Sequence, residues 1–448
     1  MNTSQQATPT SLRYFLTIWF GQLVSGIGSS MTSIAIEIWA WEITGKATTL
    51  ALVGFFSLLP GIIITPISGV VVDRFNRKLI MMMGDTVAVL TTVILLLLYI
   101  NNHLEIWHLY LASAFVSTFN QFQWLAFSAS VSLMIPKQHY TRASSLEFLL
   151  NHSAIIIAPA LAGYLYKVIG LSGIWLIDIF TFVVAISILL SVKIPQPVQT
   201  ESNQNQVIFW QVTFWQDLGS GLRYLMGKKS LQALLVVNLL FIFAHDVGSS
   251  LYLPLILSRT GNDTVVLGSL VTSAGLGGVI GALAISTWGG FKNKIKGVLL
   301  GMIGVGLTKI VFGLGRTAWV WIPPQFLCSL SFTIGGSSDQ AIWLAKIAPN
   351  LQGRVFAARS LVLQLASAVA FLISGPLADN VFVPKFIQQG SLVNIWGGIF
   401  GTGTGAGIAM LYVISAVCMF LIGLLGFSIA PLRNLEKILP DHDEVPAQ

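Results

Sequence analysis

Acidic and basic side chains are scarce in this sequence, and several of them lie inside long apolar segments. Lys and Arg together number 24 and Asp and Glu number 17 in 448 residues. A charged group that leaves water must find a partner or exchange a proton, so intramembrane ionisable residues are candidates for ion coupling. The residues of this kind are Glu37, Asp85, Asp178, His245, Asp246, Lys309 and Asp339.

Glu37 and Asp246 are the leading coupling pair because they lie in corresponding apolar segments, the first and the seventh. Glu37 stands between apolar residues and is followed by Trp39 and Trp41. Aromatic residues of this kind are typical of a membrane interface, which would place Glu37 at the level of the lipid headgroups. The alternative places Glu37 in an internal cavity, where it carries a proton. Asp246, with His245 before it, begins a polar break in its segment.

Asp339 follows the run Gly335-Gly-Ser-Ser338, which favours an interruption of its helix. It either bonds across helices, which is the favoured interpretation, or binds a cationic substrate. Asp85 and Asp178 are expected to stabilise helix ends. Lys309 either extends outward to the membrane interface or pairs with a carboxylate inside the bundle.

Four further polar or aromatic residues are close together in the fourth apolar segment. Together they predict a mixed aromatic and hydrogen-bonding cavity for a large amphipathic ligand, and singly each is also suited to bonding between helices. They are Asn120, Gln121, Gln123 and Trp124.

The composition explains why these segments are long. Hydrophobic residues make up 54% of the chain and charged residues 9%, against about 25% in a soluble domain. So few charges could not cover the surface of a globule of this length in water, which excludes an ordinary soluble enzyme. Cys328 and Cys418 lie in apolar stretches and predict core packing, with no disulfide framework and no metal site.

Twelve segments are long and apolar enough to cross a membrane as helices, and their length excludes barrel strands. The predicted fold is therefore an all-α membrane protein with twelve transmembrane helices in two six-helix halves. The segments are Tyr14 to Ala40, Thr49 to Val72, Leu79 to Ile100, Trp107 to Ile135, Ser144 to Tyr166, Leu171 to Val192, Leu231 to Leu257, Val265 to Trp288, Gly297 to Gly315, Trp319 to Ala345, Leu361 to Ala378 and Gly407 to Ile429.

The basic residues alternate between the two sides of this topology. One side carries 18 Lys and Arg and the other carries 5, and Lys309 lies within a segment. Positive charge accumulates on the cytoplasmic side of membrane proteins, so both termini are predicted to be cytoplasmic and the chain to be a multi-pass protein of the inner (plasma) membrane. The net charge of +7 thus indicates topology and not a nucleic-acid partner.

A polar linker divides the chain into its two halves. We expect an N-terminal tail at 1–13, a first half at 14–192, a linker at 193–230, a second half at 231–430 and a C-terminal tail at 431–448. The linker ends in apolar residues at helical spacing, which predicts an amphipathic helix at the membrane surface. They are Phe214, Trp215, Leu218, Leu222 and Leu225.

The two halves also carry traces of duplication, which is typical of secondary transporters. Each half has a tight basic turn around a phenylalanine, Asp73-Arg-Phe-Asn-Arg-Lys78 and Gly289-Gly-Phe-Lys-Asn-Lys294. Each half also has a proline in its fifth segment, Pro159 and Pro376.

The loop between the second and third segments resembles the signature loop of the major facilitator superfamily. It reads Gly69-Val-Val-Val-Asp73-Arg74-Phe-Asn-Arg77-Lys78. The resemblance implies a cytoplasmic gating loop in which Asp73 bonds between the halves, while the basic residues face the anionic inner leaflet. The residues of this gating loop are Gly69, Asp73, Arg74, Arg77 and Lys78.

Smaller motifs are similar to the drug/proton antiporter branch that includes macrolide-efflux and siderophore-exporting proteins. They are Ala158-Pro-Ala-Leu-Ala-Gly163, which contains Pro159 and Gly163, Pro349-Asn-Leu-Gln-Gly-Arg-Val355, and Gly375-Pro-Leu-Ala-Asp379. The first departs from the antiporter motif because the stretch before it lacks glycines. This departure puts antiport in question but not the fold.

The resemblance implies a monomeric proton-coupled exporter of small amphipathic molecules that works by alternating access. The expected partners are the lipid bilayer, a small-molecule substrate and protons, without a cofactor or a metal. No phosphate-binding loop supports an ATP-driven pump. Uptake or facilitated diffusion is the alternative within transporters, and an integral-membrane enzyme is the alternative outside them.

Overall fold

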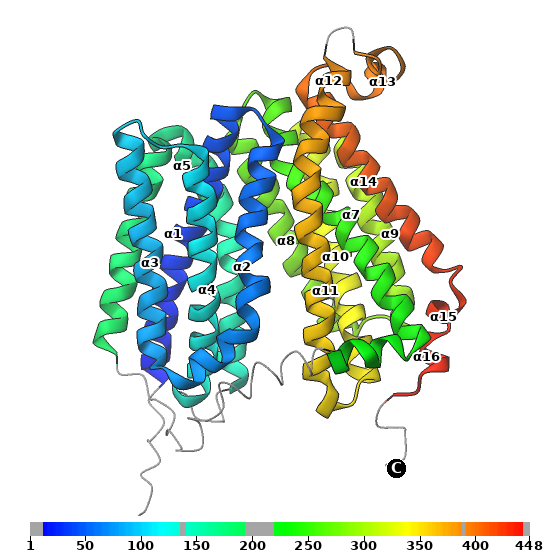
Figure 1. Ribbon diagram of the computed structural model, residues 1–448, viewed down its shortest axis with the longest axis horizontal. Helices are drawn as coiled ribbons and strands as arrows, with labels where there is room; N and C mark the ends of the chain where they lie inside the picture. Colours follow the sequence, from blue (N-terminus) through cyan, green and yellow to red (C-terminus); the bar gives the residue numbers. More distant parts are fainter. Residues whose placement is uncertain (1–11, 135–139, 193–218, 388–389, 442–448) are drawn as a thin grey trace, which may run out of the picture. The chain divides into compact units, whose positions relative to one another are not determined.

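The computed structural model describes residues 12–134, 140–192, 219–387 and 390–441, and every regular element in these ranges is a helix (Figure 1). The long helices are α1 (Leu12–Thr44), α2 (Ala47–Arg74), α3 (Arg77–Ile100), α4 (Ile106–Met134), α5 (Tyr140–Ser191), α7 (Lys229–Thr260), α8 (Thr264–Trp288), α9 (Lys294–Leu314), α10 (Ala318–Lys346), α11 (Pro349–Leu377) and α14 (Thr404–Gly426). The short ones are the π-helix η3 (Ala378–Phe382), α12 (Val383–Phe386), α13 (Val393–Phe400), α15 (Ala430–Arg433) and α16 (Leu435–Ile438).

α5 contains two of the predicted membrane segments. Its path changes at Gly170, where φ is 66° and ψ is −172°, a conformation that favours glycine. Counting α5 as two, the long helices in the described ranges supply all twelve predicted segments. By length and hydropathy alone, 9 stretches of the described chain qualify as membrane spans, and one of them, Ile156–Ser191, includes the joint at Gly170. The all-helical membrane fold is confirmed.

Side chains at the helix ends explain where several helices begin and stop. The side chain of Asn76 caps α3 and that of Asp263 caps α8, each accepting two backbone N–H bonds. Gly261 and Gly289 end α7 and α8 in the left-handed conformation. Pro159 lies inside α5, which continues through it. Pro376 lies near the end of α11, directly before the π-helix η3.

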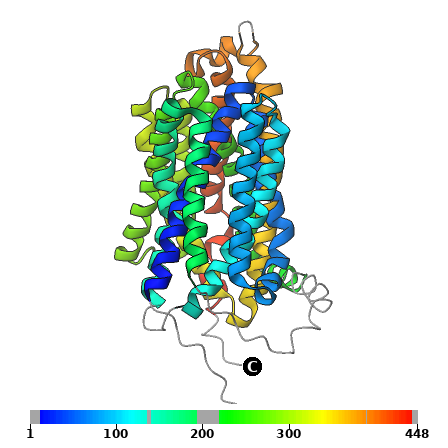
Figure 2. The ribbon, with the colours of Figure 1, turned by 90° about the vertical axis from the view of Figure 1, so that its left-hand side faces the viewer.

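The chain divides into two compact units, unit 1 (Met1–Trp39 and Phe56–Phe209) and unit 2 (Ala40–Phe55 and Trp210–Gln448). In unit 1 the long helices run side by side (Figure 2). Its main core joins α1, α3 and α4 through Phe15, Met81 and Phe127, which are all buried.

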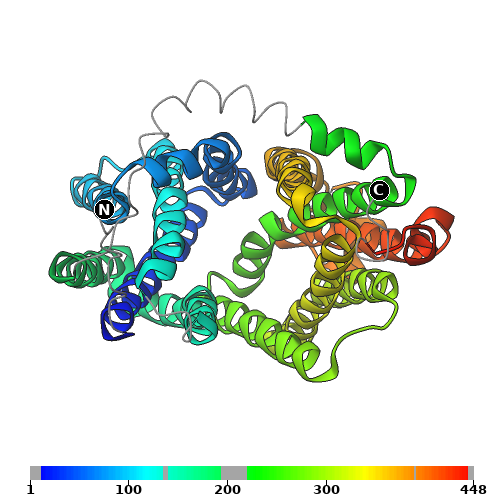
Figure 3. The same cartoon turned by 90° about the horizontal axis from the view of Figure 1, so that it is seen from below.

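Unit 2 has a larger core, built from α7, α9, α10 and α14, whose ends are seen in Figure 3. α8, α9 and α10 meet through glycines. A Cβ atom on Gly301 would lie 2.5 Å from Gly335 Cα, and one on Gly277 would lie 2.2 Å from Phe326 O. Gly277 is therefore a packing position.

The start of α2 also packs in unit 2. Asp379, in η3, accepts hydrogen bonds from the backbone N–H groups of Ala47 at 3.0 Å and Thr48 at 2.8 Å. A Cβ on Gly375 would lie 2.4 Å from Thr48 Cα, so the absence of a side chain lets α11 approach α2 at this point. Trp41, near the end of α1, donates to Asn262 Oδ1 at 3.1 Å.

In the linker, the structure describes residues 219–230, of which 219–226 form a helix. There Leu225 is fully buried in the core of unit 2, and Leu222 packs against the same core. This face of the helix therefore contacts protein. Phe214, Trp215 and Leu218 lie outside the described residues.

The two cysteines differ in their surroundings. Cys328 is buried, as predicted, whereas Cys418 on α14 is exposed. The prediction of core packing was wrong for Cys418, because an apolar segment gives no sign of which of its faces is turned outward.

Candidate functional site

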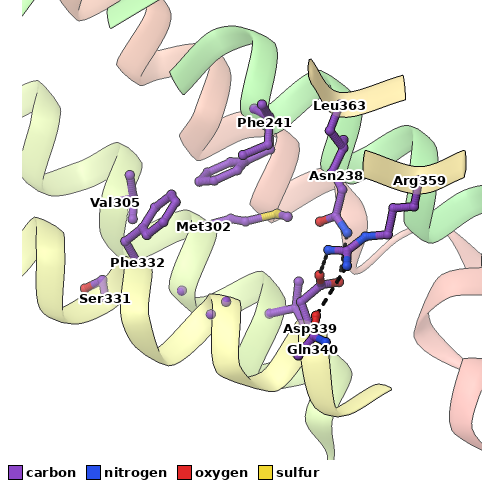
Figure 4. A pocket seen from close by; sticks show the side chains of 15 residues that line it. Asn238, Phe241, Met302, Val305, Ser331, Phe332, Asp339, Gln340, Arg359 and Leu363 are labelled. Atoms are coloured by element: carbon purple, nitrogen blue, oxygen red, sulfur yellow. Dashed lines mark hydrogen bonds and ion pairs between the residues drawn. The ribbon is translucent and has the colours of Figure 1, made fainter. Parts of the chain in front are cut away.

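A cavity of about 180 Å³ lies among α7, α9, α10 and α11 of unit 2 (Figure 4). One wall is apolar and carries two phenylalanines and a methionine, and the other end carries Asp339, Gln340 and Arg359. Small residues on α9 and α10 leave the space open, since no atom lies within 4 Å of a Cβ built on Gly336. The apolar wall is formed by Phe241, Met302, Val305, Phe332 and Leu363.

Asp339 and Arg359 form an ion pair at the polar end of the cavity (Figure 4). Asp339 also accepts hydrogen bonds from Asn238 Nδ2 at 2.8 Å and from Trp343 Nε1 at 3.0 Å. The guanidinium of Arg359 lies over the ring of Trp343, 4.8 Å from its centre. Asp339 thus bonds across helices, as the favoured interpretation predicted, and at the same time lines a cavity.

The helix interruption predicted before Asp339 is absent. α10 is helical from Ala318 to Lys346, through the whole run Gly335-Gly-Ser-Ser338. The prediction was wrong because these small residues serve helix packing. A Cβ on Gly301 of α9 would clash with Gly335, and one on Gly297 would lie 2.4 Å from Ser338 Oγ.

A second polar cluster, on α7 and α9, contains the predicted residues His245 and Asp246. His245 Nδ1 lies 2.9 Å from Asp246 Oδ1 and 3.3 Å from Ser249 Oγ. Lys309 Nζ lies 3.5 Å from Ser249 Oγ and 3.5 Å from the carbonyl oxygen of His245. We call these four residues the α7–α9 cluster.

Lys309 is buried in unit 2, with 6% of its surface exposed, and does not extend outward. Its amine lies 5.7 Å from the centre of the Tyr412 ring. The hydroxyl groups of Tyr252 and Tyr412 are buried without a hydrogen-bond partner among the described residues. An amine in such surroundings is an electrostatic feature of the site and not a surface charge.

Aromatic rings connect the α7–α9 cluster to the cavity. The His245 ring lies 4.9 Å from the Phe332 ring and 6.2 Å from the Phe241 ring, measured between centres. Both phenylalanines line the cavity. His245 therefore contacts two rings of the apolar wall.

The carboxylates of unit 1 bond between helices. Asp85 on α3 is buried and accepts from Gln123 Nε2 at 2.6 Å and from Gln22 Nε2 at 3.3 Å. Asp178 on α5 is also buried and accepts hydrogen bonds from three hydroxyl groups, those of Ser29, Thr32 and Thr92. The prediction that both residues stabilise helix ends was wrong, because their donors come from the middle of neighbouring helices.

Glu37 lies on α1, half-buried, and forms no hydrogen bond or ion pair with the residues that the structure describes. The aromatic belt predicted beside it is not found. Trp39 is buried, and its ring meets that of Tyr99 at 6.2 Å, while Trp41 is buried and bonds to Asn262. Both tryptophans therefore pack within protein. The role of Glu37 as a coupling residue stays a prediction.

The polar residues of α4 are not gathered into one site. Gln123 is bonded to Asp85 and, at 3.1 Å, to Gln22 Oε1, which is the role between helices that the sequence also suggested. Asn120 and Trp124 are exposed and Gln121 is half-buried. Within unit 1, the structure thus brings Gln123 together with Asp85 and Gln22.

The gating loop is described in part. The surroundings of Gly69 and the side chains of Asp73 and Arg74 lie outside what the structure describes. The bonding of Asp73 between the halves and the exposure of Arg74 to the inner leaflet therefore stay predictions. Arg77 is buried and donates to Ala129 O at 2.6 Å. Lys78 donates to Leu190 O at 3.1 Å and Val192 O at 2.7 Å.

Arg77 thus connects α3 to α4, and Lys78 connects α3 to the end of α5. The sequence predicted that both side chains face the anionic lipid leaflet, whereas the structure shows both bonded to backbone carbonyl groups of the protein. Carbonyl groups near a helix end lack intrahelical donors, which makes those of Leu190 and Val192 good partners for Lys78.

In the antiporter-like helix, Pro159 and Gly163 are both buried.

The sequence alone did not identify Arg359, Asn238, Phe241, Met302 and Phe332 as site residues. A signal was present on α7, where Asn238, Phe241 and His245 recur at helical spacing and so share one face. Arg359 lies just before the segment Leu361 to Ala378, so it is one of the 18 basic residues counted on the predicted cytoplasmic side. Among the described residues no three potential metal ligands gather, so the site offers hydrogen bonds, one ion pair and aromatic surface.

The chain is similar to proteins of one known family. A family profile described as the Major Facilitator Superfamily matches residues 18–371. Macrolide efflux protein A of Streptococcus pyogenes is 28% identical over 383 residues, which is 85% of this chain and 93% of that protein. The multidrug efflux pump Tap of Mycolicibacterium fortuitum is 22% identical over 83% of this chain and 91% of its own length.

Among solved structures, the fold is similar to that of a bacterial homologue of the human lysosomal transporter Spinster. The TM-score is 0.72 at 14% sequence identity, and the match covers 98% of this chain and 100% of the other. At this identity the likeness concerns the fold alone.

Proposed function

Since this chain belongs to the major facilitator superfamily, we propose that it is a secondary active transporter that exports small amphipathic molecules in exchange for protons. The family and the apolar helices make it a multi-pass membrane protein. Export, proton antiport and alternating access of the two six-helix halves are the parts of the proposal that need a test. The distribution of basic residues supports cytoplasmic termini and a place in the inner membrane.

The observation that carries the proposal is the cavity of unit 2 with the α7–α9 cluster beside it. The apolar wall suits the hydrophobic body of an amphipathic molecule, and the ion pair at the other end suits its polar groups. The Nε–H of Arg359 is buried and has no acceptor among the described residues. A ligand that brings a hydroxyl or carbonyl oxygen would satisfy this donor.

The names of the relatives support the same class of substrate. Two relatives are described as efflux proteins, one for macrolides and one for multiple drugs. A macrolide is an oxygen-rich amphipathic molecule, which matches the chemistry of the cavity. We therefore propose macrolide-like compounds as the first substrates to test, with siderophore-like compounds as the second.

Proton coupling is assigned to Asp246 with His245, and to Glu37. Asp246 is paired with the imidazole of His245, whose ring contacts Phe332 of the cavity wall, and it lies near a buried amine. One proton moving down 100 mV releases about 2.3 kcal/mol, which supports a gradient of about fiftyfold.

Everted membrane vesicles that contain this chain provide the test. With an acidic interior, they should accumulate radiolabelled erythromycin, and the accumulation should disappear when a protonophore removes the gradient. Asp246→Asn and Glu37→Gln should insert normally and lose gradient-driven accumulation. Ser258→Ala is the matched control, since Ser258 on α7 bonds to the carbonyl of Leu255 in its own helix. Near-normal accumulation by both carboxyl variants would remove them from the mechanism.

A further inference from the structure

His245 Nδ1 lies within hydrogen-bond distance of two partners of different character, a carboxylate that only accepts and a hydroxyl that can donate or accept. Asp246 Oδ1 is 2.9 Å away and Ser249 Oγ is 3.3 Å away. An ionised carboxylate only accepts hydrogen bonds, so it requires a hydrogen on Nδ1. A serine hydroxyl that donates to Nδ1 requires that the nitrogen be free of hydrogen. The nitrogen can therefore be a donor to one residue or an acceptor, but not both at once.

Lys309 completes this arrangement from the neighbouring helix. Its Nζ lies at hydrogen-bond distance from Ser249 Oγ and from the carbonyl of His245, both at 3.5 Å. It therefore contacts the same serine that lies beside the ring nitrogen of His245. A continuous chain of polar contacts joins the buried amine to Ser249, to His245 and to Asp246.

We propose that Lys309 and Ser249 are positioning residues that set the pH at which the His245–Asp246 pair takes up its proton. This inference rests on the proposed function and deepens it. Lys309 acts by its charge on the pair. Ser249 acts by contacting both Lys309 Nζ and His245 Nδ1, which keeps the amine close to the ring.

The protons balance in one step. In the unloaded pair, Nδ1–H donates to the Asp246 carboxylate and Nε2 carries no hydrogen. An incoming proton binds to Nε2, and the hydrogen on Nδ1 moves to Asp246 Oδ1, so that Nδ1 now accepts from the carboxyl group. The ring is neutral before and after, and Asp246 changes from charged to neutral. The net result is one proton bound and one negative charge removed.

The position of the ring connects this step to the substrate. The His245 ring contacts Phe332 and Phe241, which form part of the cavity wall. The exchange of hydrogen between the two ring nitrogens therefore occurs against the surface on which an amphipathic molecule would lie. Proton binding and substrate binding then act on the same ring.

Few other ionisable groups face the cluster. α10 contributes Cys328 and α14 contributes Tyr412, and Tyr252 lies on α7 itself. The described sequence of α8, the helix that follows α7, contains no ionisable side chain. On α11 the ionisable partner is Arg359, which is paired with Asp339 at the far end of the cavity. Among the described residues of unit 2, Lys309 is thus the basic side chain that faces Asp246.

The first experiment measures erythromycin export against pH in proteoliposomes. Lys309→Met should move the midpoint of the pH profile by about one pH unit, the size of effect expected when a nearby charge is removed. Lys309→Arg keeps the charge and should restore a midpoint close to that of the wild type. Ser249→Ala should move the midpoint by a smaller amount, and the control Ser258→Ala should leave it unchanged.

The second experiment keeps this inference separate from the proposed function. Infrared difference spectra of the purified protein follow the carboxyl band that Asp246→Asn removes, without substrate or gradient. The midpoint of this band should move in Lys309→Met and return in Lys309→Arg. If wild-type vesicles show no proton-driven export while the band behaves in this way, the proposed function fails and the positioning role stands. A wild-type midpoint in Lys309→Met overturns the positioning role, whatever is transported.

Discussion

The carboxylate of Asp379 accepts a hydrogen bond of 2.6 Å from the hydroxyl of Thr48, a residue 331 positions away in the sequence. Together with the two backbone bonds at Ala47 and Thr48, this contact makes Asp379 the cap of α2. A helix is usually capped by a residue directly before it. Here the cap comes from the π-helix that follows α11, so the beginning of α2 is held by a residue of the second half of the chain.

Asp379→Ala should loosen the first turn of α2. Loss of an N-cap costs about 1 kcal/mol, which corresponds to roughly fivefold faster hydrogen exchange of the amides at the start of the helix. Asp379→Asn keeps one accepting oxygen, so its rate of hydrogen exchange at these amides should lie between those of the wild type and of Asp379→Ala. Asp263→Ala is the matched control, since Asp263 caps α8, and its effect should appear at α8 while α2 exchanges as before. Unchanged exchange at Ala47 and Thr48 in Asp379→Ala would contradict this account.

Breaking the pair between Asp339 and Arg359 should destabilise the protein more than removing both charges. The two side chains are mostly buried, at 9% and 17% exposure. A single variant such as Arg359→Met leaves a buried carboxylate without its counter-ion and should cost about 3–5 kcal/mol. The double variant Asp339→Asn with Arg359→Met should recover part of this loss. Thermal unfolding in detergent measures the effect, and a double variant less stable than both single variants would be the contrary result.

Two glycines that line the cavity, Gly301 on α9 and Gly336 on α10, should respond differently to a methyl group. Gly301→Ala forces its Cβ to within 2.5 Å of Gly335 Cα and should lower stability by about 1–3 kcal/mol. Gly336→Ala has no atom within 4 Å of its Cβ and should fold like the wild type. Because Gly336 lines the cavity, Gly336→Leu should fold and weaken erythromycin export. If the Leu variant exports normally, the cavity is not the substrate site.

The carboxylates of unit 1 should separate into a structural and a functional kind. Asp178 accepts three hydroxyl hydrogen bonds, so Asp178→Asn should cost about 1–3 kcal/mol of stability through unsatisfied polar groups. The proton dependence of export should stay as in the wild type. Glu37→Gln disturbs no hydrogen bond among the described residues, so it should keep the stability of the wild type and lose the proton dependence of export. Vesicle transport and thermal unfolding, measured on both variants, decide between the two kinds.

The sequence predicted the membrane helices because apolarity over about twenty residues is a local property. A charge inside an apolar segment stands out whatever surrounds it, and for this reason the sequence pointed to His245 and Asp246, which the structure places in one polar cluster with Ser249 and Lys309. Their role in coupling stays a prediction. Asp339 was recognised for the same reason, and its bonding across helices followed from the cost of leaving a carboxylate unpaired.

The errors concern properties that depend on a neighbour. Trp39 and Trp41 have the composition of an interfacial belt, but the same residue types fill protein cores. The glycines and serines before Asp339 resemble a helix break until Gly301 on the next helix is known. Arg359 could equally be a topological charge, and only the position of Asp339 makes it part of a site. Which face of a helix meets which partner is a tertiary property.

The joint at Gly170 has a consequence for how the chain is made. With no loop between them, the two parts of α5 meet at one glycine whose φ of 66° suits few other residues. With no loop between the two segments, the first has no stretch of polar chain that could remain in water at the far surface while the second is synthesised. The two parts of α5 should therefore enter the bilayer as one hairpin during synthesis, and a bulky residue at Gly170 should impair biogenesis before it impairs transport.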